Sequence, residues 1–358
     1  MQEVIEMFQK DTRNAMAAKV YAQQIAFAPF VFQSSRILRD FGILSIIEES
    51  GETGINTKDI HAKTKLSEYS VRVLLEAGLG IGLLTIDEDR YILTRTGYFI
   101  LHDKMTIANM DFTHDVCYQG LFDLDKSLIS GKPEGLKVFG NWKTIYEALA
   151  HLPDHVKKSW FAFDHYYSSD SFPVVIDHVF KSNPAKILDI GGNTGKWALS
   201  CFAHSPTVRV GIADLPGQLN VAKQTISKNG YTDRAEFFEV DLLNENCPLP
   251  KGFDVIWMSQ FLDCFSENEI VSILKRCYDA LPANGQVIIL EPLWDKQTYE
   301  VSAFCLQMTS LYFTAMANGN SQMYHSELFT GLIRKAGFSF VERIDRIGIC
   351  HSMMKCSK

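Results

Sequence analysis

The 358-residue sequence lacks two features that would place it in other functional classes. It has no excess of basic residues, because 35 Lys and Arg stand against 42 Asp and Glu, giving a formal net charge of -7. A nucleic-acid partner needs a clustered basic face for most of its affinity, so this balance argues against one. No uninterrupted apolar run approaches the roughly 18 residues of a membrane span, so we expect no membrane partner either.

The sequence also has no paired-cysteine motif, and we expect no secretory leader. The eight cysteines form no Cys-x-x-Cys pair, and four lie within predicted strands or helices, as small apolar residues would. The first residues include Glu3, Glu6 and Asp11 rather than a basic start followed by an apolar block. We therefore expect a reduced, cytoplasmic setting and predict no metal site.

The segment from Lys186 to Gly195 has the order of a strand, a tight turn and a helix. Ile187, Leu188 and Ile190 suit a buried parallel strand, and the glycines that follow let the backbone approach a ligand where a Cβ would clash. The turn lacks the Gly-Lys-Ser/Thr ending of a phosphate loop, and its Asp-x-Gly-Gly-x-x-Gly spacing fits the dinucleotide fingerprint only loosely. It predicts a nucleotide-type ligand.

Two further predicted strands end in a carboxylate, as the strand before the glycine turn does with Asp189. Residues 207–213 lead to Asp214, and residues 237–240 lead to Asp241. Asp214 is placed to accept hydrogen bonds from both ribose hydroxyls of a nucleoside, and Asp241 to accept from the exocyclic amine of adenine. Each carboxylate alone could be a helix cap or a solvated loop residue, but three in register predict an adenosine site.

These residues resemble the S-adenosylmethionine-dependent small-molecule O-methyltransferases of the plant caffeate and hydroxyindole type. Supporting motifs are Asp214-Leu215-Pro216, the predicted strand 253–258, the predicted helix 273–281 and Leu290-Glu291-Pro292. The resemblance covers nearly the whole chain and implies S-adenosyl-L-methionine as cofactor, a small-molecule acceptor and a homodimer. The cofactor-binding residues that it implies are Asp189, Gly191, Gly192, Gly195, Asp214, Leu215, Asp241, Leu242, Ser259, Tyr167 and Ser168.

The fold class implied is α/β, with a Rossmann-like class I methyltransferase domain of seven mixed strands after a mostly α-helical winged-helix dimerisation domain. We predict three parts: a dimerisation domain over 1–100, a helical linker and pocket roof over 101–180, and a cofactor-binding domain over 181–358. In the first part, helices are predicted over 15–27, 30–49, 58–62 and 68–77, with a hairpin of 83–86 and 90–94.

A winged helix alone would suggest a transcription regulator. The predicted reading helix offers only Arg72 as a cation, and the hairpin tip is triply acidic at Asp87, Glu88 and Asp89. Such charges repel DNA phosphates, so a regulator is the less favoured alternative.

The catalytic residues depart from the pattern that the resemblance implies. Asp263 stands at the position of the family's histidine base, and Glu291 matches the first of two glutamates that steady it, while Met323 stands at the second. An aspartate with an ordinary pKa of about 3.9 is a poor base toward a phenol unless burial beside Glu291 raises that pKa. His325 is the other candidate base, although a lone histidine is more often structural.

The acceptor is expected to be apolar or aromatic, and O-methylation is favoured. We favour an acceptor that needs little help in deprotonation, such as an acidic enol, a hydroxyquinone or a carboxylate, or else a carbon or nitrogen nucleophile. A relative that binds the cofactor without methyl transfer is the second alternative. The predicted substrate-pocket residues are Phe161, Trp294, Met308, Tyr312, Met316 and Met323.

Overall fold

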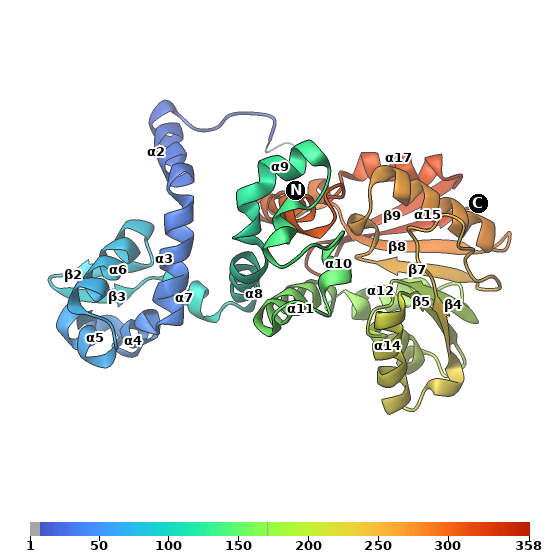
Figure 1. Cartoon of the computed structure of the whole chain (residues 1–358), viewed down its shortest axis with the longest axis horizontal. Helices are drawn as coiled ribbons and strands as arrows, with labels where there is room; N and C mark the ends of the chain where they lie inside the picture. The colour runs from blue at the N-terminus through green and yellow to red at the C-terminus, as the bar shows by residue number, and fades with distance from the viewer. Residues whose placement is uncertain (1–7, 170) are drawn as a thin grey trace. The chain divides into compact units, whose positions relative to one another are not determined.

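The structure is a computed structural model that describes residues 8–169 and 171–358 (Figure 1). The chain forms two compact units, one of residues 11–115 and one of residues 116–358 that also takes in residues 8–10. The first unit therefore extends past residue 100, where the sequence placed a domain boundary. It also contains helices α7 (Arg95–His102) and α8 (Lys104–Phe112).

Helices surround a small three-stranded sheet in the first unit. The helices are α2 (Ala15–Ala26), α3 (Ala28–Asp40), α4 (Ile43–Glu49), α5 (Thr57–Lys63) and α6 (Glu68–Ile81), with α7 and α8. The strand order is β1-β3-β2, for β1 (Ile55–Asn56), β2 (Leu84–Asp87) and β3 (Arg90–Leu93). This confirms the predicted winged-helix order of helices and hairpin.

The predicted single helix over 30–49 is wrong, because the chain turns at Gly42. This residue has a φ of 74°, in the left-handed region that glycine adopts without a Cβ clash. The helix therefore ends at Asp40, and α4 begins anew at Ile43. The break lets Leu38 and Ile47 both enter the core of this unit.

The second unit is built on a seven-stranded mixed sheet of order β6-β5-β4-β7-β8-β10-β9. The strands β4 to β8 are parallel, and β10 is antiparallel to both of its neighbours. The predicted sheet is thus confirmed, including its terminal strand pair. The bounds are β4 (Lys186–Ile190), β5 (Arg209–Asp214), β6 (Ala235–Glu239), β7 (Val255–Ser259), β8 (Gln286–Pro292), β9 (Phe340–Ile347) and β10 (His351–Ser357).

Helices cover both faces of this sheet (Figure 1). On one face, Trp197 stacks on Trp257 with ring centroids 4.0 Å apart, within a core that also holds residues of α12 and α14. On the other face, residues of α15 and α17 form a second core. The helices are α9 (Leu124–Ser130), α10 (Ile145–Ala148), α11 (Asp154–Ser169), α12 (Phe172–Phe180), α13 (Lys196–His204), α14 (Pro216–Lys228), α15 (Glu267–Ala280), α16 (Glu300–Tyr312) and α17 (Ser326–Lys335).

The strand order reverses at β4, which lies between β5 and β7. In open parallel sheets, ligands bind outside the carboxyl ends of the strands at such a reversal. We therefore expect the ligand site among the residues that follow β4, β5 and β7. Within the described residues, no helix has the length and apolar character to cross a membrane.

Candidate active site

The glycine turn after β4 brings backbone to the reversal point of the sheet. Gly191 has a φ of 72°, and a Cβ there would clash with the ring of Phe261. A Cβ on Gly192 would lie 2.7 Å from Oδ2 of Asp189. Side chains are thus excluded on both sides of the turn, which leaves backbone N–H groups at the start of α13 for a ligand.

Replacing Gly191 with alanine is expected to lower stability by roughly 1–3 kcal/mol and to weaken binding of a nucleoside ligand, because the new Cβ meets Phe261 and the left-handed backbone disfavours it. Thermal unfolding and calorimetry with S-adenosylhomocysteine measure both effects. Gly217→Ala is the matched control, since a Cβ at Gly217 would meet no atom within 4 Å and its φ is not positive. Equal behaviour of the two variants would contradict the clash.

Asp189 is buried at the end of β4, with 2% of its surface exposed. Its Oδ2 atom has no hydrogen-bond donor among the described residues. Burial, together with the nearby Asp214 carboxylate, raises its pKa well above the usual value. A buried acceptor without a donor is rare in native proteins, so this atom marks a site for a donor from a ligand.

Asp214 lies beside the glycine turn, as predicted. Its Oδ2 accepts a hydrogen bond from the N–H of Asn193 at 2.9 Å, and its Oδ1 accepts one from the N–H of Leu215 at 2.7 Å. Burial raises the pKa of Asp214, and these two bonds counter the rise. The carboxylate is therefore fixed in orientation, and each oxygen keeps a lone pair for a ribose hydroxyl.

The other predicted cofactor contacts lie in different surroundings. Asp241 is exposed after β6, where its Oδ1 accepts from the N–H of Leu243 at 3.0 Å, and Leu242 is buried. Ser259 ends β7, and its buried Oγ has no partner among the described residues. Tyr167 is half-buried on α11, and the side chain of Ser168 lies outside the described residues. These contacts stay predictions.

A pair of buried carboxyl groups lies near the carboxyl ends of β7 and β8, with Glu291 in β8 and Asp263 after β7. Glu291 is 1% exposed, and its Oε1 accepts from the N–H groups of Phe261 at 2.9 Å and Leu262 at 2.7 Å. These bonds hold the turn in which Gln260 has an unusual φ of 47°. Backbone outliers of this kind gather at functional sites.

Asp263 follows directly, in the short helical turn η6 (Leu262–Cys264). It is 6% exposed, and its Oδ1 accepts a weak bond from the thiol of Cys264 at 3.4 Å. Burial raises the pKa of Asp263 to about 7, and burial with Asp263 nearby raises that of Glu291 well above its usual value. The pair can therefore hold or release a proton near neutral pH.

Three residues around this pair were missed as functional residues from the sequence: Asp164, Tyr146 and Cys264. Burial raises the pKa of Asp164 to about 6, and its charge raises that of Asp263. Tyr146 lies beside Cys264, and both thiol and phenol are kept neutral by burial, which raises their pKa values. The only available signal was an acidic residue, Asp164, within the aromatic segment of α11.

The predicted base His325 lies in a different cluster. It is the N-cap of α17, where its Nδ1 accepts from the N–H of Glu327 at 3.2 Å, and its Nε2 lies 3.6 Å from Asp295. Its ring packs edge-on against Trp294, with centroids 5.1 Å apart. These contacts give His325 a structural role as a cap, and its use as a base stays a prediction that the packing does not favour.

The predicted pocket residues differ in burial. Tyr312, Met316 and Met323 are buried, Phe161 and Trp294 are half-buried, and Met308 is 45% exposed. The hydroxyl of Tyr312 accepts from Nε1 of Trp160 at 2.8 Å, and burial, with a smaller contribution from Asp164, raises the pKa of Tyr312 well above its usual value. Among the described residues, no group of three or more His, Cys, Asp or Glu is arranged to hold a metal ion.

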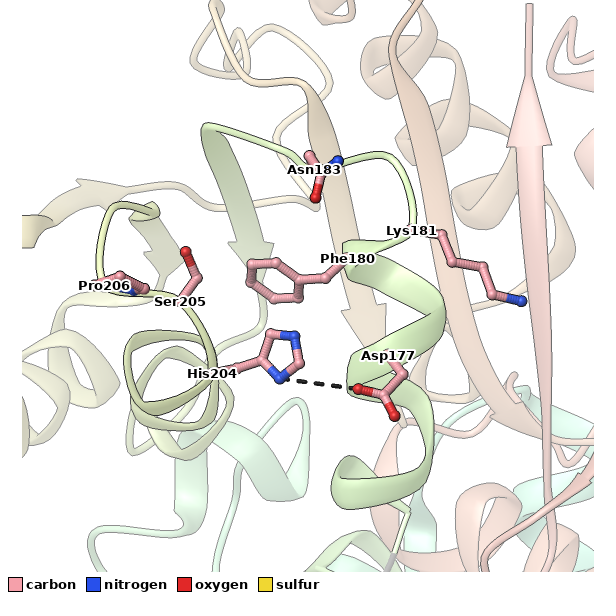
Figure 2. A pocket seen from close by; sticks show the side chains of 7 residues that line it. All are labelled: Asp177, Phe180, Lys181, Asn183, His204, Ser205 and Pro206. Carbon is pink, nitrogen blue, oxygen red and sulfur yellow. Dashed lines mark ion pairs between the residues drawn. The ribbon is translucent and has the colours of Figure 1, made fainter.

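A shallow hollow of about 330 Å³ lies elsewhere on this unit (Figure 2). It is formed at the ends of α12 and α13, where Nδ1 of His204 lies 3.9 Å from Oδ1 of Asp177. Helix α13 begins at the glycine turn and ends at His204, so the hollow lies at the other end of this helix. We assign it no part in the site.

Comparison with known families identifies both units. Residues 19–91 match the Dimerisation2-like domain, and residues 162–339 match the O-methyltransferase domain. The chain belongs to the O-methyltransferase family. It is a methyltransferase that depends on S-adenosylmethionine, and the resemblance given by the sequence motifs is confirmed.

Relatives extend over most of the chain. An L-tyrosine C(3)-methyltransferase from Streptomyces lavendulae is 24% identical over 90% of this chain and 87% of its own. A 3-hydroxy-5-methyl-1-naphthoate 3-O-methyltransferase from Streptomyces sahachiroi is 30% identical over 46% of each chain. The S-adenosylmethionine-dependent methyltransferase SibL, solved in its apo form, shares the fold, with a TM-score of 0.71 and 22% identity over 94% of this chain and 98% of its own.

The residues of this methyltransferase fit its cofactor. The glycine turn leaves a cradle that a Cβ would fill, Asp189 offers a buried oxygen without a donor among the described residues, and Asp214 is oriented for the ribose. Glu291, near the carboxyl end of β8, and Asp263, after the neighbouring strand β7, lie at the edge of the sheet where ligands bind in folds of this kind.

Proposed function

We propose that this methyltransferase acts on a hydroxyl-bearing small aromatic acceptor, with Asp263 as the general base. The supporting observation is the buried Asp263 carboxyl with a pKa of about 7, beside Glu291 and two residues after Phe261, whose ring packs against Gly191 of the glycine turn. An acid of this strength accepts a proton far better than an exposed aspartate, whose pKa is about 3.9. It thereby removes the objection that aspartate is too weak a base for a phenol.

The cofactor, when bound, supplies an electrophilic methyl group on a sulfonium. The residues of this chain would do the rest: Asp263 takes the proton from the acceptor hydroxyl, while Glu291 holds residues 261–262 through its two backbone bonds. Tyr312 and Trp160, linked at 2.8 Å, form an aromatic wall that positions the ring of the acceptor. Positioning can lower the barrier of such an in-line displacement by about 7 kcal/mol or more.

O-methylation is the favoured outcome, and methylation of a ring carbon is the second candidate. Deprotonation makes both the oxygen and the adjacent ring carbons of a phenol more nucleophilic, so one base serves either product. The similarity to an L-tyrosine C(3)-methyltransferase over 90% of this chain supports the second candidate. Labelled-methyl transfer to a panel of phenols, followed by NMR of the product, distinguishes the two. Cofactor binding with no transfer to any acceptor would contradict the proposal.

We propose that the chain forms a homodimer through α2 and α3. Helix α2 buries none of its residues within the described chain, and Met16, Ile25 and Phe30 are 70%, 59% and 71% exposed. An apolar face of this kind marks an interaction site. The match of residues 19–91 to a dimerisation domain supports the same interpretation.

Phe30→Glu is expected to shift the dimer toward monomer, because a charge in an apolar interface loses its hydration. Size-exclusion chromatography with light scattering measures the mass. Tyr69→Glu on α6 is the matched control, since this aromatic residue is 66% exposed and lies outside the proposed interface. A monomeric unmodified protein would contradict the dimer.

A further inference from the structure

Asp164 is a carboxyl group that the proposed reaction does not use. It lies on α11 four residues after Trp160, so the two side chains share one face of the helix. Trp160 in turn donates to the hydroxyl of Tyr312 at 2.8 Å. Asp164 therefore belongs to the aromatic wall of the proposed acceptor site.

A structural aspartate in this unit is well supplied with partners. Asp295, for comparison, accepts from the N–H of Ser326 at 2.7 Å and from its hydroxyl at 2.6 Å, and it lies 3.3 Å from Nζ of Lys296. Asp164 has no hydrogen bond or ion pair of this kind with any described residue. The cation that acts on it, Lys196, has an exposed side chain.

Acidic side chains outnumber basic ones among the groups that interact electrostatically with Asp164 and Asp263. The charge of Asp164 acts on the titration of Asp263, and that of Asp263 acts on Glu291. An independent sign of an absent partner is Oε2 of Glu291, which is buried and has no donor among the described residues, although the side chain is only 1% exposed. A buried carboxyl oxygen without a partner favours a ligand that supplies a hydrogen-bonding group there.

The aromatic residues add a second attraction for a cation. Trp160 and Tyr312 lie at this site, and Tyr146 lies beside Cys264 and within the influence of Asp263. The faces of such rings attract an ammonium group, most strongly when water is excluded. Carboxylates together with aromatic faces are the combination that a protonated amine requires.

We infer that Asp164 forms an ammonium-binding subsite, and that the methyl acceptor is an aromatic compound carrying both a hydroxyl group and a protonated aliphatic amine. This inference rests on the proposed function. Asp164 binds the amine at one end of the acceptor, and Asp263 takes the hydroxyl proton at the other. The cofactor also carries an ammonium group, on its amino-acid end, so the experiment must separate the two sources.

The test uses the full-length protein and two pairs of acceptors that differ in charge. Tyramine is compared with 4-(2-hydroxyethyl)phenol, and L-tyrosine with 3-(4-hydroxyphenyl)propionate, in a labelled-methyl assay. We expect an amine to raise kcat/KM by at least about tenfold. Asp164→Asn should raise the KM for the amines by about 10–100-fold, as for loss of a charge-assisted bond, and leave the neutral acceptor unchanged.

Two controls make the result specific. Asp177→Asn replaces an exposed carboxylate on α12 and should change neither KM. The Kd of S-adenosylhomocysteine should stay within about twofold in Asp164→Asn. If this Kd rises tenfold or more while the preference for amines is unchanged, Asp164 serves the cofactor and the inference is overturned.

The inference and the proposed function can fail separately. Equal turnover of charged and neutral phenols by the unmodified protein would overturn the ammonium subsite and leave the methyl transfer standing. If no phenol is methylated, the proposed function fails, and calorimetry with the protein saturated in S-adenosylhomocysteine still tests the subsite. Tyramine should then bind at least tenfold more tightly than 4-(2-hydroxyethyl)phenol, and equal binding would overturn the inference.

Discussion

Asp214→Ala is expected to raise the Kd for S-adenosylhomocysteine by at least about 100-fold. The substitution removes the carboxylate, so the ribose hydroxyls would lose two charge-assisted hydrogen bonds, each contributing roughly 1.5–3 kcal/mol. The same change removes the acceptor for the N–H groups of Asn193 and Leu215, which fix the glycine turn and the start of α14. Binding and preorganisation are therefore lost together, and isothermal titration calorimetry measures the sum.

Asp241→Ala provides the contrast for this prediction. Asp241 is exposed and accepts only a local backbone bond from Leu243, so its removal should weaken binding by less than about tenfold. A thermal unfolding curve close to that of the unmodified protein shows that each variant is folded. Tight binding by folded Asp214→Ala would contradict the ribose role.

The cofactor half of the site could be predicted from the sequence because its signals are local. A buried strand, a glycine turn and a carboxylate at the end of the next strand occur in fixed order along the chain, and parallel pairing brings the strand ends together. The structure accordingly places the carboxylate of Asp214 against the N–H of Asn193 in the turn. The seven-stranded mixed sheet was expected from the resemblance to the methyltransferase family and not from the strand spacing alone.

The acceptor half depends on contacts between distant segments, and the sequence revealed less of it. Asp164 and Asp263 are 99 positions apart in the sequence, yet in the fold the charge of Asp164 acts on the pKa of Asp263. No spacing rule brings them together. His325 shows the reverse error, in which the sequence suggests a functional residue that the fold uses for structure. Its residue type suggested a base, but it caps the N-terminus of α17.

The break at Gly42 shows the same limit at the level of local structure. Apolar residues continue across the break from Leu38 to Ile47, so periodicity alone indicated one helix. Gly42, in a left-handed conformation, turns the chain and ends the first helix at Asp40. Glycine inside a helical pattern is tolerated often enough that the turn could not be inferred from the residue type.

Asp263→Asn is expected to lower kcat by on the order of 10²–10⁴-fold, as for loss of a general base, while the Kd of S-adenosylhomocysteine stays within a few-fold. In the unmodified protein the active form of Asp263 is the deprotonated one, and its pKa is about 7. The value of kcat/KM should therefore fall about tenfold for each pH unit below about 7 and level off above it. In Asp263→Asn this inflection should disappear.

Glu291→Gln tests whether Glu291 acts on the base Asp263 through its charge or through the turn that it holds. Gln keeps a carbonyl oxygen to accept from Phe261 and Leu262, so the turn that carries Asp263 stays in place. The charge of Asp263 raises the pKa of Glu291, so Glu291 keeps its proton and carries no charge while Asp263 ionises. Glu291→Gln should therefore leave the inflection of the pH profile near 7, which burial of Asp263 sets. An inflection shifted by one pH unit or more in a folded variant would show that Glu291, and not burial, sets the basicity of Asp263.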